Sequence, residues 1–478
     1  MGSRYHFLKT LTESPRSLLK VCILVAFSLF FIYHFSNSYL FTRYVRDQSF
    51  GGDEPKYLRM VNSMVHYGTL DLSKYFGPEV ELEKTKQKNI SSGSRRFADL
   101  YLIGMDNGIY CLHMPGVSFL LIPSYCLDFI QYPMNPKKET MVLSFLPSKL
   151  YFTRIFLMIM AILTILLLFR FLNTFFKSHT LSSILTLIFI FNSPFPSYAF
   201  MLYPAGLATF YSLLVMNAIF SPFKNRILNM ISIIVGIGYL PWLHQRFIPL
   251  SLGLFLTFIF SRYNKKLPLK EVLIVSISLL ILSLPYFYYF YSITGSPSPL
   301  SASQLFGKTY ARLNILPLGF FGYLFSVTRG FLWHYPWVIL FLFGIYLGLR
   351  TNRRYSLYLL LIFSPYYLMC SAAIPFELTN PIGRYLLPVF PILLLFCGII
   401  LQNLFKHFSY VKLLFFCSYF MLIFLNKKIG FIHYKFNYSY MTSNNLIVIV
   451  KCILIIFFMF VSIYMGEKYL WKEKNFNQ

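Results

Sequence analysis

Long apolar segments, separated by short segments that contain lysine and arginine, make up most of the chain. A helix needs about 20 apolar residues to cross a bilayer, and roughly twelve segments approach that length. The pattern therefore predicts an all-α polytopic membrane protein. The expected transmembrane helices are centred near Ser28, Ile162, Ile188, Leu213, Ile234, Leu254, Leu279, Leu342, Leu361, Leu394, Phe420 and Phe458.

The first apolar segment is longer than the core of a signal peptide and no small-residue cleavage site follows it, so we expect a retained anchor. A long polar stretch comes next and is expected to be a large first extracytoplasmic loop with amphipathic interfacial helices. The expected parts are a cytoplasmic N-terminus (1–20), the first transmembrane helix (21–41), the extracytoplasmic loop (42–149), the helix bundle (150–466) and a cytoplasmic tail (467–478).

The apolar segment 117–130 bears on the orientation of all later helices. It has about 14 residues, which as a helix would extend ~21 Å against a hydrocarbon core of ~30 Å. It also contains Pro123 and Asp128. We therefore expect this segment to be interfacial or re-entrant, whereas a membrane crossing here would invert every helix after it.

The excess of basic residues fits a membrane protein better than a nucleic-acid-binding one. The chain has 43 basic and 16 acidic residues, for a formal net charge of +27, but 57% of its residues are hydrophobic. The basic residues gather in the short segments between apolar ones, as topology determinants do. With twelve helices, these clusters fall on the side of the N-terminus, which should be cytoplasmic, and we expect no nucleic-acid partner.

Acidic residues are concentrated in the expected extracytoplasmic loop, which holds eleven of the sixteen. Between residues 140 and 466 the others are Glu271, at a cytoplasmic edge, and Glu377, in an external segment. A carboxylate inside a span would cost at least ~2.5–3.5 kcal/mol and would usually mark an ion or proton path. The absence of one in mid-span argues against a proton-coupled transporter and indicates acid chemistry at the outer face.

Residues 51–58 (GGDEPKYL) contain two adjacent carboxylates, Asp53 and Glu54. Pro55 fits the first turn of a helix, apolar residues then recur at helical spacing, and Gly68 offers a stop. The pattern predicts a short amphipathic helix with both carboxylates at its N-terminus. The alternative role for Asp53 is a helix cap alone.

Three more segments at the expected outer face carry imidazole or guanidinium groups. His113 opens the segment 117–130, where the alternative is a turn with an incidental histidine. His244 and Arg246 lie in a very short link between the fifth and sixth helices, and Arg384 lies at the external mouth of the tenth. For both arginines the alternative is a side chain that simply extends to the interface.

The sequence contains no nucleotide-phosphate loop, no zinc-type spacing and no Gly-x-Ser-x-Gly elbow. An enzyme with a nucleotide donor at a Gly-rich loop is therefore not expected. No metal ligands are assigned, and a requirement for a divalent metal is left open. Cys111 and Cys126 lie outside the expected helices, where a disulfide would depend on their Cα separation.

These motifs resemble those of the GT-C superfamily of membrane-embedded glycosyltransferases, above all the protein O-mannosyltransferase and lipid A aminoarabinose transferase group. That group carries an Asp-Glu pair in its first external loop, often followed by a basic residue and tyrosine, as in 53–57 (DEPKY). It also carries a His- or Asn-led Pro-rich motif, matched by 113–116 (HMPG) with methionine in place of one expected proline. Segments 241–244 (PWLH) and 384–388 (RYLLP) are similar as well, whereas Ala205 stands where many relatives have glutamate.

The resemblance implies a GT-C-type bundle and a sugar donor linked to a polyprenyl phosphate. The sugar would be transferred at the extracytoplasmic face to a lipid, glycan or protein acceptor, with membrane lipids around the protein and no certain cofactor. In a bacterium the chain would lie in the inner membrane, with its active site facing outside the cytoplasm.

A sugar hydroxyl is a poor nucleophile, so a carboxylate must accept its proton. We predict Asp53 as this base. Glu54 would be its orienting partner or an alternate base, because an aspartate that caps a helix is less basic. The leaving lipid phosphate gains negative charge, which cations already in place stabilise. The predicted substrate-binding residues are Lys56, Tyr57, His113, His244, Arg246 and Arg384.

Two other functions are compatible with the chain. A transporter or flippase of lipid-linked saccharides should have polar or broken-helix features near the middle of the bilayer, and often repeated halves. Here the polar groups gather at one face. A scaffold without an active site would leave the Asp-Glu pair and the outward cations unexplained.

Overall fold

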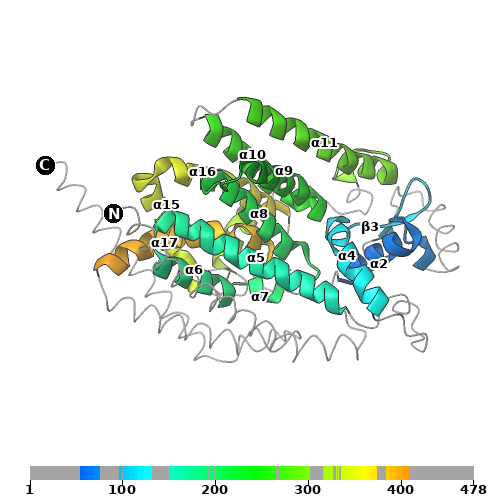
Figure 1. The fold of residues 1–478 in the computed structure, drawn as a ribbon, viewed down its shortest axis with the longest axis horizontal. Helices are drawn as coiled ribbons and strands as arrows, with labels where there is room; N and C mark the ends of the chain where they lie inside the picture. The colour runs from blue at the N-terminus through cyan, green and yellow to red at the C-terminus, as the bar shows by residue number, and fades with distance from the viewer. Residues whose placement is uncertain are drawn as a thin grey trace, which may run out of the picture.

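The structure is a computed structural model, and the residues that it describes are mostly helical (Figure 1). Five of its helices are long and apolar enough to cross a membrane. They are α5 (Tyr151–Phe176), α9 (Arg226–Leu243), α11 (Leu269–Thr294), α16 (Arg353–Ala373) and α17 (Phe390–His407) with the short turn η6 (Arg384–Val389) before it. The described ranges are 54–75, 96–98, 101–131, 150–191, 193–198, 201–263, 269–301, 316–326, 330, 332, 335–373 and 384–407.

Shorter helices complete the bundle. Nine of the twelve predicted helix centres fall in helices of the structure, and those near Ser28, Phe420 and Phe458 lie outside the described residues. The total number of transmembrane helices therefore stays a prediction. The shorter elements are α6 (His179–Phe191), α7 (Phe195–Tyr198), α8 (Pro204–Phe220), η2 (Gln245–Phe247), α10 (Ile248–Tyr263), α13 (Leu316–Phe325), η4 (Pro336–Val338) and α15 (Ile339–Thr351).

Local sequence explains several helix boundaries. Pro204 occupies the first turn of α8, where its missing N–H leaves no hydrogen bond unmade. Asn225 caps α9, and its side chain accepts hydrogen bonds from the N–H groups of Ile227 and Leu228. Helix α8 packs between α5 and α9, α10 packs against α9 and α16, and α11 lies against α9 at the edge of the bundle (Figure 1).

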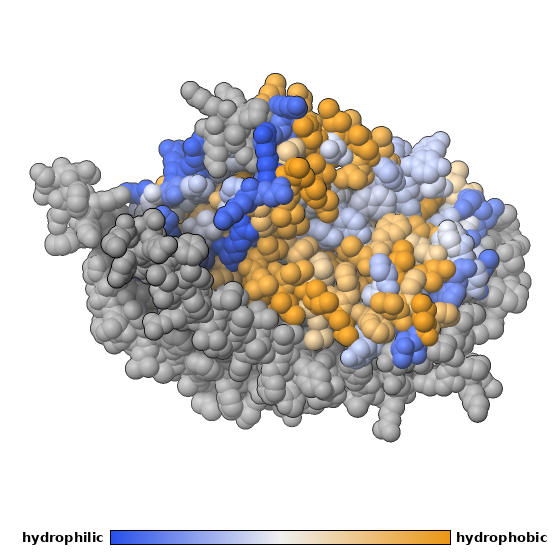
Figure 2. Space-filling view, viewed as in Figure 1, coloured by the Kyte–Doolittle hydropathy of each residue, from blue (hydrophilic) through white to orange (hydrophobic). Residues whose placement is uncertain are grey.

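The bundle has a basic end. Arg170, near the end of α5, donates a hydrogen bond to the carbonyl of Ser221 just after α8 (2.7 Å). At the start of α9, Arg226 forms an ion pair with Glu271 at the start of α11 (2.7 Å). Figure 2 shows apolar residues between a hydrophilic region at the upper left of the described surface and a second one at its right.

A small layer covers the opposite end and consists of α2 (Glu54–Tyr67), η1 (Ser73–Tyr75), three short strands and α4 (Gly116–Gln131) (Figure 1). The strands β1 (Arg96–Ala98), β2 (Tyr101–Ile103) and β3 (Ile109–Cys111) form an antiparallel sheet in that order. This sheet corrects the expectation of an all-α protein.

The β2–β3 hairpin turns through Asn107, whose φ of 64° lies in the left-handed region that asparagine tolerates. Its ladder pairs Tyr101 with Cys111 and Ile103 with Ile109. The N–H of Met105 in the turn donates to the carbonyl of Ile293 near the end of α11 (2.9 Å). The sheet is thereby attached to the same end of the bundle as α2 and α4.

The segment expected to be interfacial or re-entrant is the 16-residue helix α4. At a rise of 1.5 Å per residue it extends about 24 Å, which is shorter than a hydrocarbon core. Its Asp128 is buried and accepts hydrogen bonds from the N–H groups of Phe152 (2.6 Å) and Thr153 (2.9 Å), so it caps α5 from another helix. Cys126 in α4 and Cys111 in β3 are both free thiols.

Candidate active site

Helix α2 is buried over most of its length, at both apolar and polar positions. It begins at Glu54 and ends at Tyr67, before Gly68, whose φ of 64° lets the chain leave the helix. The predicted helix and its stop are confirmed, and Tyr57 and Val61 are buried. Asp53, predicted to precede it as the base, lies outside the described residues.

Helix α4 packs between α2 and the end of α9. The Ser118 hydroxyl donates to the carbonyl of Tyr57 (2.9 Å), and the Tyr239 hydroxyl donates to the carbonyl of Gly116 (2.8 Å). A Cβ atom at Gly116 would lie 2.3 Å from the backbone oxygen of Trp242, so only glycine permits this approach. The close contact brings His113, just before α4, next to the loop that follows α9.

Four of the predicted substrate-binding residues form one row, which we call the Tyr57–Arg246 row. The ring centroids of Tyr57 and His113 are 5.5 Å apart, and those of His113 and His244 are 6.2 Å apart. The Nδ1 atom of His244 accepts a hydrogen bond from the backbone N–H of Arg246 (3.1 Å). The row thus brings together residues of α2, of the segment before α4 and of the link after α9.

The guanidinium of Arg246 is buried between aromatic rings. The residue is 4% exposed, and its guanidinium carbon lies 4.8 Å from the ring centroid of Phe247 and 4.6 Å from that of Tyr385. Its Nε and Nη2 atoms have no hydrogen-bond partner among the residues that the structure describes. A buried cation without such partners is costly, so the arrangement suits an anionic ligand.

The carbonyl of Tyr385 accepts a hydrogen bond from the Tyr366 hydroxyl, which fixes the turn η6 next to Arg246. Arg384 begins this turn, so its backbone lies beside the row, but its side chain is outside the described part of the chain. Lys56 is buried in α2. The roles predicted for Arg384 and Lys56 stay predictions.

Glu54 is fully buried and has partners on two other segments. Its Oε1 atom accepts a hydrogen bond from Arg154 Nη1 (3.3 Å) and another from the backbone N–H of Leu202 (2.9 Å). Burial raises the pKa of this carboxyl, while Arg154 and the Leu202 N–H act in the opposite direction. Its Oε2 atom has no partner in the described ranges.

Arg154 was not among the residues predicted from sequence. It lies in the first turn of α5, at the same end of the bundle as Arg246. Like Arg246, Arg154 lies at a helix end away from the basic clusters, so the charge bias of the sequence could have singled it out. Within the described residues, no group of three or more His, Cys, Asp or Glu side chains is arranged to hold a metal ion.

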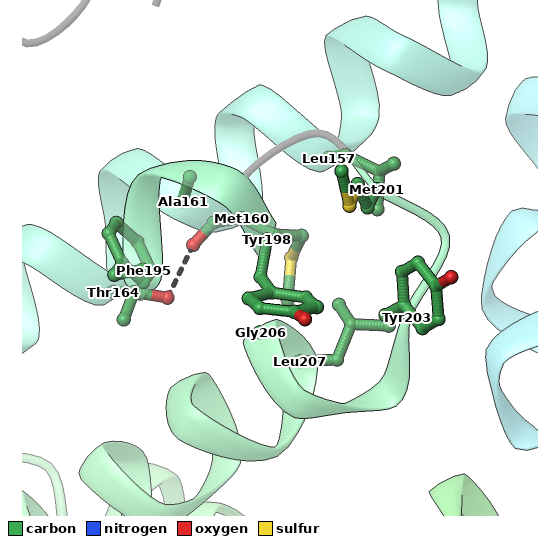
Figure 3. A pocket seen from close by; sticks show the side chains of 10 residues that line it. All are labelled: Leu157, Met160, Ala161, Thr164, Phe195, Tyr198, Met201, Tyr203, Gly206 and Leu207. Carbon is green, nitrogen blue, oxygen red and sulfur yellow. Dashed lines mark hydrogen bonds between the residues drawn. The ribbon is translucent and has the colours of Figure 1, made fainter. Parts of the chain in front are cut away.

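A pocket lies beside the Glu54 contact, between α5, α7 and the start of α8 (Figure 3). It contains about 260 Å³ of empty space, including its opening. Leu157 in its wall is one turn after Arg154, and Met201 precedes Leu202. The lining is mostly apolar and consists of Leu157, Met160, Ala161, Thr164, Phe195, Tyr198, Met201, Tyr203, Gly206 and Leu207.

Comparisons of the chain with protein-family models and with curated proteins find no match. Among solved structures, ArnT from Cupriavidus metallidurans in the apo state is similar in 88% of this chain and 71% of that chain. The two are 13% identical in sequence, with a TM-score of 0.46. A likeness of this extent does not assign a function.

Proposed function

We propose that this chain is an integral-membrane glycosyltransferase of the GT-C type, with about twelve transmembrane helices. It transfers a sugar from a polyprenyl-phosphate-linked donor to a lipid, glycan or protein acceptor at the extracytoplasmic face. The observation that carries the proposal is the buried guanidinium of Arg246, whose backbone N–H binds His244, the neighbour of His113.

The Tyr57–Arg246 row supports a site for the phosphate of such a donor. Arg246 has two nitrogens without partners in the described part of the chain, and phosphate oxygens accept hydrogen bonds from guanidinium groups well. When the bond between the sugar and the phosphate breaks, the phosphate gains negative charge. Cations already in place stabilise that charge more in the transition state than in the bound donor. Arg384 would add a second guanidinium next to Tyr385.

The acceptor hydroxyl loses its proton to Asp53 in this proposal. In the sequence Asp53 directly precedes Glu54, the first residue of α2. Glu54 suits the role of orienting partner better than that of base, because it is fully buried and Oε1 already has two partners.

The experiment compares the cell-envelope glycans of the source cell, by mass analysis, with the gene present, deleted, or replaced by Asp53→Asn. Deletion should remove a single sugar from one glycan or lipid, and the Asp53→Asn variant should fail to restore it. Asp47→Asn is the matched control, since Asp47 is another carboxylate of the same loop, and this variant should restore the sugar.

Two outcomes would contradict the proposal. Full activity of the Asp53→Asn variant would show that another group accepts the proton. Accumulation of a complete lipid-linked precursor in the deletion strain would indicate a transporter or flippase of lipid-linked saccharides instead.

A further inference from the structure

Glu54 makes a direct polar connection between helix α2 and the bundle. Three further polar contacts of α2 connect it to its own layer: Ser118 binds the carbonyl of Tyr57, Tyr125 binds Asn62, and Arg59 binds Tyr101. The main packing partner of α2 among the described elements is α4. The first residue of α2 therefore helps to set the position of this helix relative to α5 and α8.

A single oxygen of Glu54 connects α2 to two segments that are distant in the sequence. Oε1 accepts from Arg154 in the first turn of α5 and from Leu202 just before α8, which are 100 and 148 residues further along the chain. Glu54 has 0% exposure, and the Arg154 side chain has 10%. A general base must come within hydrogen-bonding distance of the proton that it accepts, so the burial of Glu54 and its two partners favour a positioning role over that of a base.

We propose that Glu54 and Arg154 are positioning residues: their contact fixes α2 to the bundle and so sets the place of Tyr57 relative to His113 and the rest of the row. The attachment of α2 is a property of the fold alone. Its effect on sugar transfer rests on the proposed function. The contact needs an acceptor oxygen at position 54, which glutamine also supplies, whereas a base needs a carboxylate.

Hydrogen exchange tests the attachment without any assay of transfer. The exchange of the peptide that covers residues 54–67 is measured in the full-length detergent-solubilised protein. In Glu54→Ala and Arg154→Met, α2 should exchange at least tenfold faster, because a local opening no longer breaks this contact. Glu54→Gln should stay within about threefold of the parent, since its amide oxygen can accept both hydrogen bonds.

Arg226→Gln is the matched control, because it removes the ion pair with Glu271 at the other end of the bundle and should leave α2 exchange unchanged. If Arg154→Met is not recovered as a folded protein, Arg154→Lys replaces it. Lysine keeps the charge but not the planar donor group, so exchange between that of the parent and that of Glu54→Ala is expected. Unchanged exchange in Glu54→Ala would overturn the proposal.

Activity separates positioning from proton transfer once the Asp53 experiment has given a product to measure. Glu54→Gln should keep at least about a tenth of kcat with an unshifted pH profile, whereas loss of a general base costs about 10²–10⁴-fold. If Glu54→Gln is as inactive as Glu54→Ala while α2 exchange stays slow, Glu54 is the base and the proposal is wrong. Failure of the proposed function would leave the exchange result intact, so the two failures are distinguishable.

Discussion

The guanidinium of Arg246 was recognisable in the sequence as a cation at the outer membrane edge, where the inside bias of basic residues makes it unusual. The burial of this guanidinium between Phe247 and Tyr385 could not be predicted from the sequence, because Tyr385 comes from a distant segment of the chain. The contacts of Glu54 could not be predicted from the sequence for the same reason. Its adjacency to Asp53 is visible in the chain, but its contacts with Arg154 and Leu202 arise only in the folded bundle.

The two buried arginines should respond differently to the loss of charge. Arg154 has a carboxylate partner, so Arg154→Met leaves Glu54 buried without its cation and should lower the melting temperature by about 5 °C or more. Arg246 has no carboxylate partner in the described structure, so Arg246→Met should keep the melting temperature or raise it by up to about 3 °C. Thermal unfolding of the solubilised protein measures both. An equal loss in the two variants would show that Arg246 has a structural counterion.

Among the elements, helices were more predictable than strands. The helix at 54–67 follows from its apolar spacing, and Gly68 marks its end. The helix at 116–131 follows from an apolar run too short to cross the membrane. The sheet was missed because its strands have three residues each, too few for an alternating pattern, although the Asn107-Gly108 pair is a recognisable hairpin signal.

Asp128 caps α5 from α4, and its removal should destabilise the contact between the two helices. Asp128→Ala should cost about 0.5–2 kcal/mol, the usual value of a lost cap, whereas Asp128→Asn should retain most of the stability.

The pH dependence of stability gives a second test of Asp128, because burial raises the pKa of the Asp128 carboxyl above its usual value of 3.8. The folded protein then binds the proton more tightly than the unfolded chain. The contribution of this residue is therefore complete below pH 3.8 and declines as the pH rises through the raised value. Thermal unfolding measured from below pH 3.8 upward should show a smaller decline in Asp128→Asn than in the parent, because the variant retains only the other titrating carboxyls. Equal pH dependence in both proteins would mean that Asp128 does not titrate in this way.

At the scale of the whole molecule, the sequence predicted that basic residues and site residues occupy opposite ends, and the helices described here agree. Arg170 and Arg226 lie at one end, and His113 and Arg246 at the other. Charge bias is readable in the sequence because it is a property of composition near each helix end. The number of transmembrane helices cannot be predicted from the sequence as readily, because several apolar helices are shorter than the length needed to cross a membrane.

Chemical labelling can test which end faces outward. In intact cells, a membrane-impermeant maleimide should label the variant Met105→Cys, whose substituted residue lies in the exposed hairpin turn. It should label the variant Lys224→Cys only after the cells are permeabilised. The parent chain with its native cysteines gives the background. Labelling of both positions in intact cells, or of Lys224 alone, would contradict an outward-facing Tyr57–Arg246 row.

The bond between Glu54 and the N–H of Leu202 also has a consequence for biogenesis. The two residues are 148 positions apart, so at about 5–20 residues per second the ribosome adds Leu202 roughly 7–30 s after Glu54. Arg154 is added about two thirds of the way through this interval, so α2 has neither of its distant partners during the first part and lacks Leu202 until the end. Until the later helices insert, α2 lacks its contacts with the bundle and is accessible to chaperones and proteases.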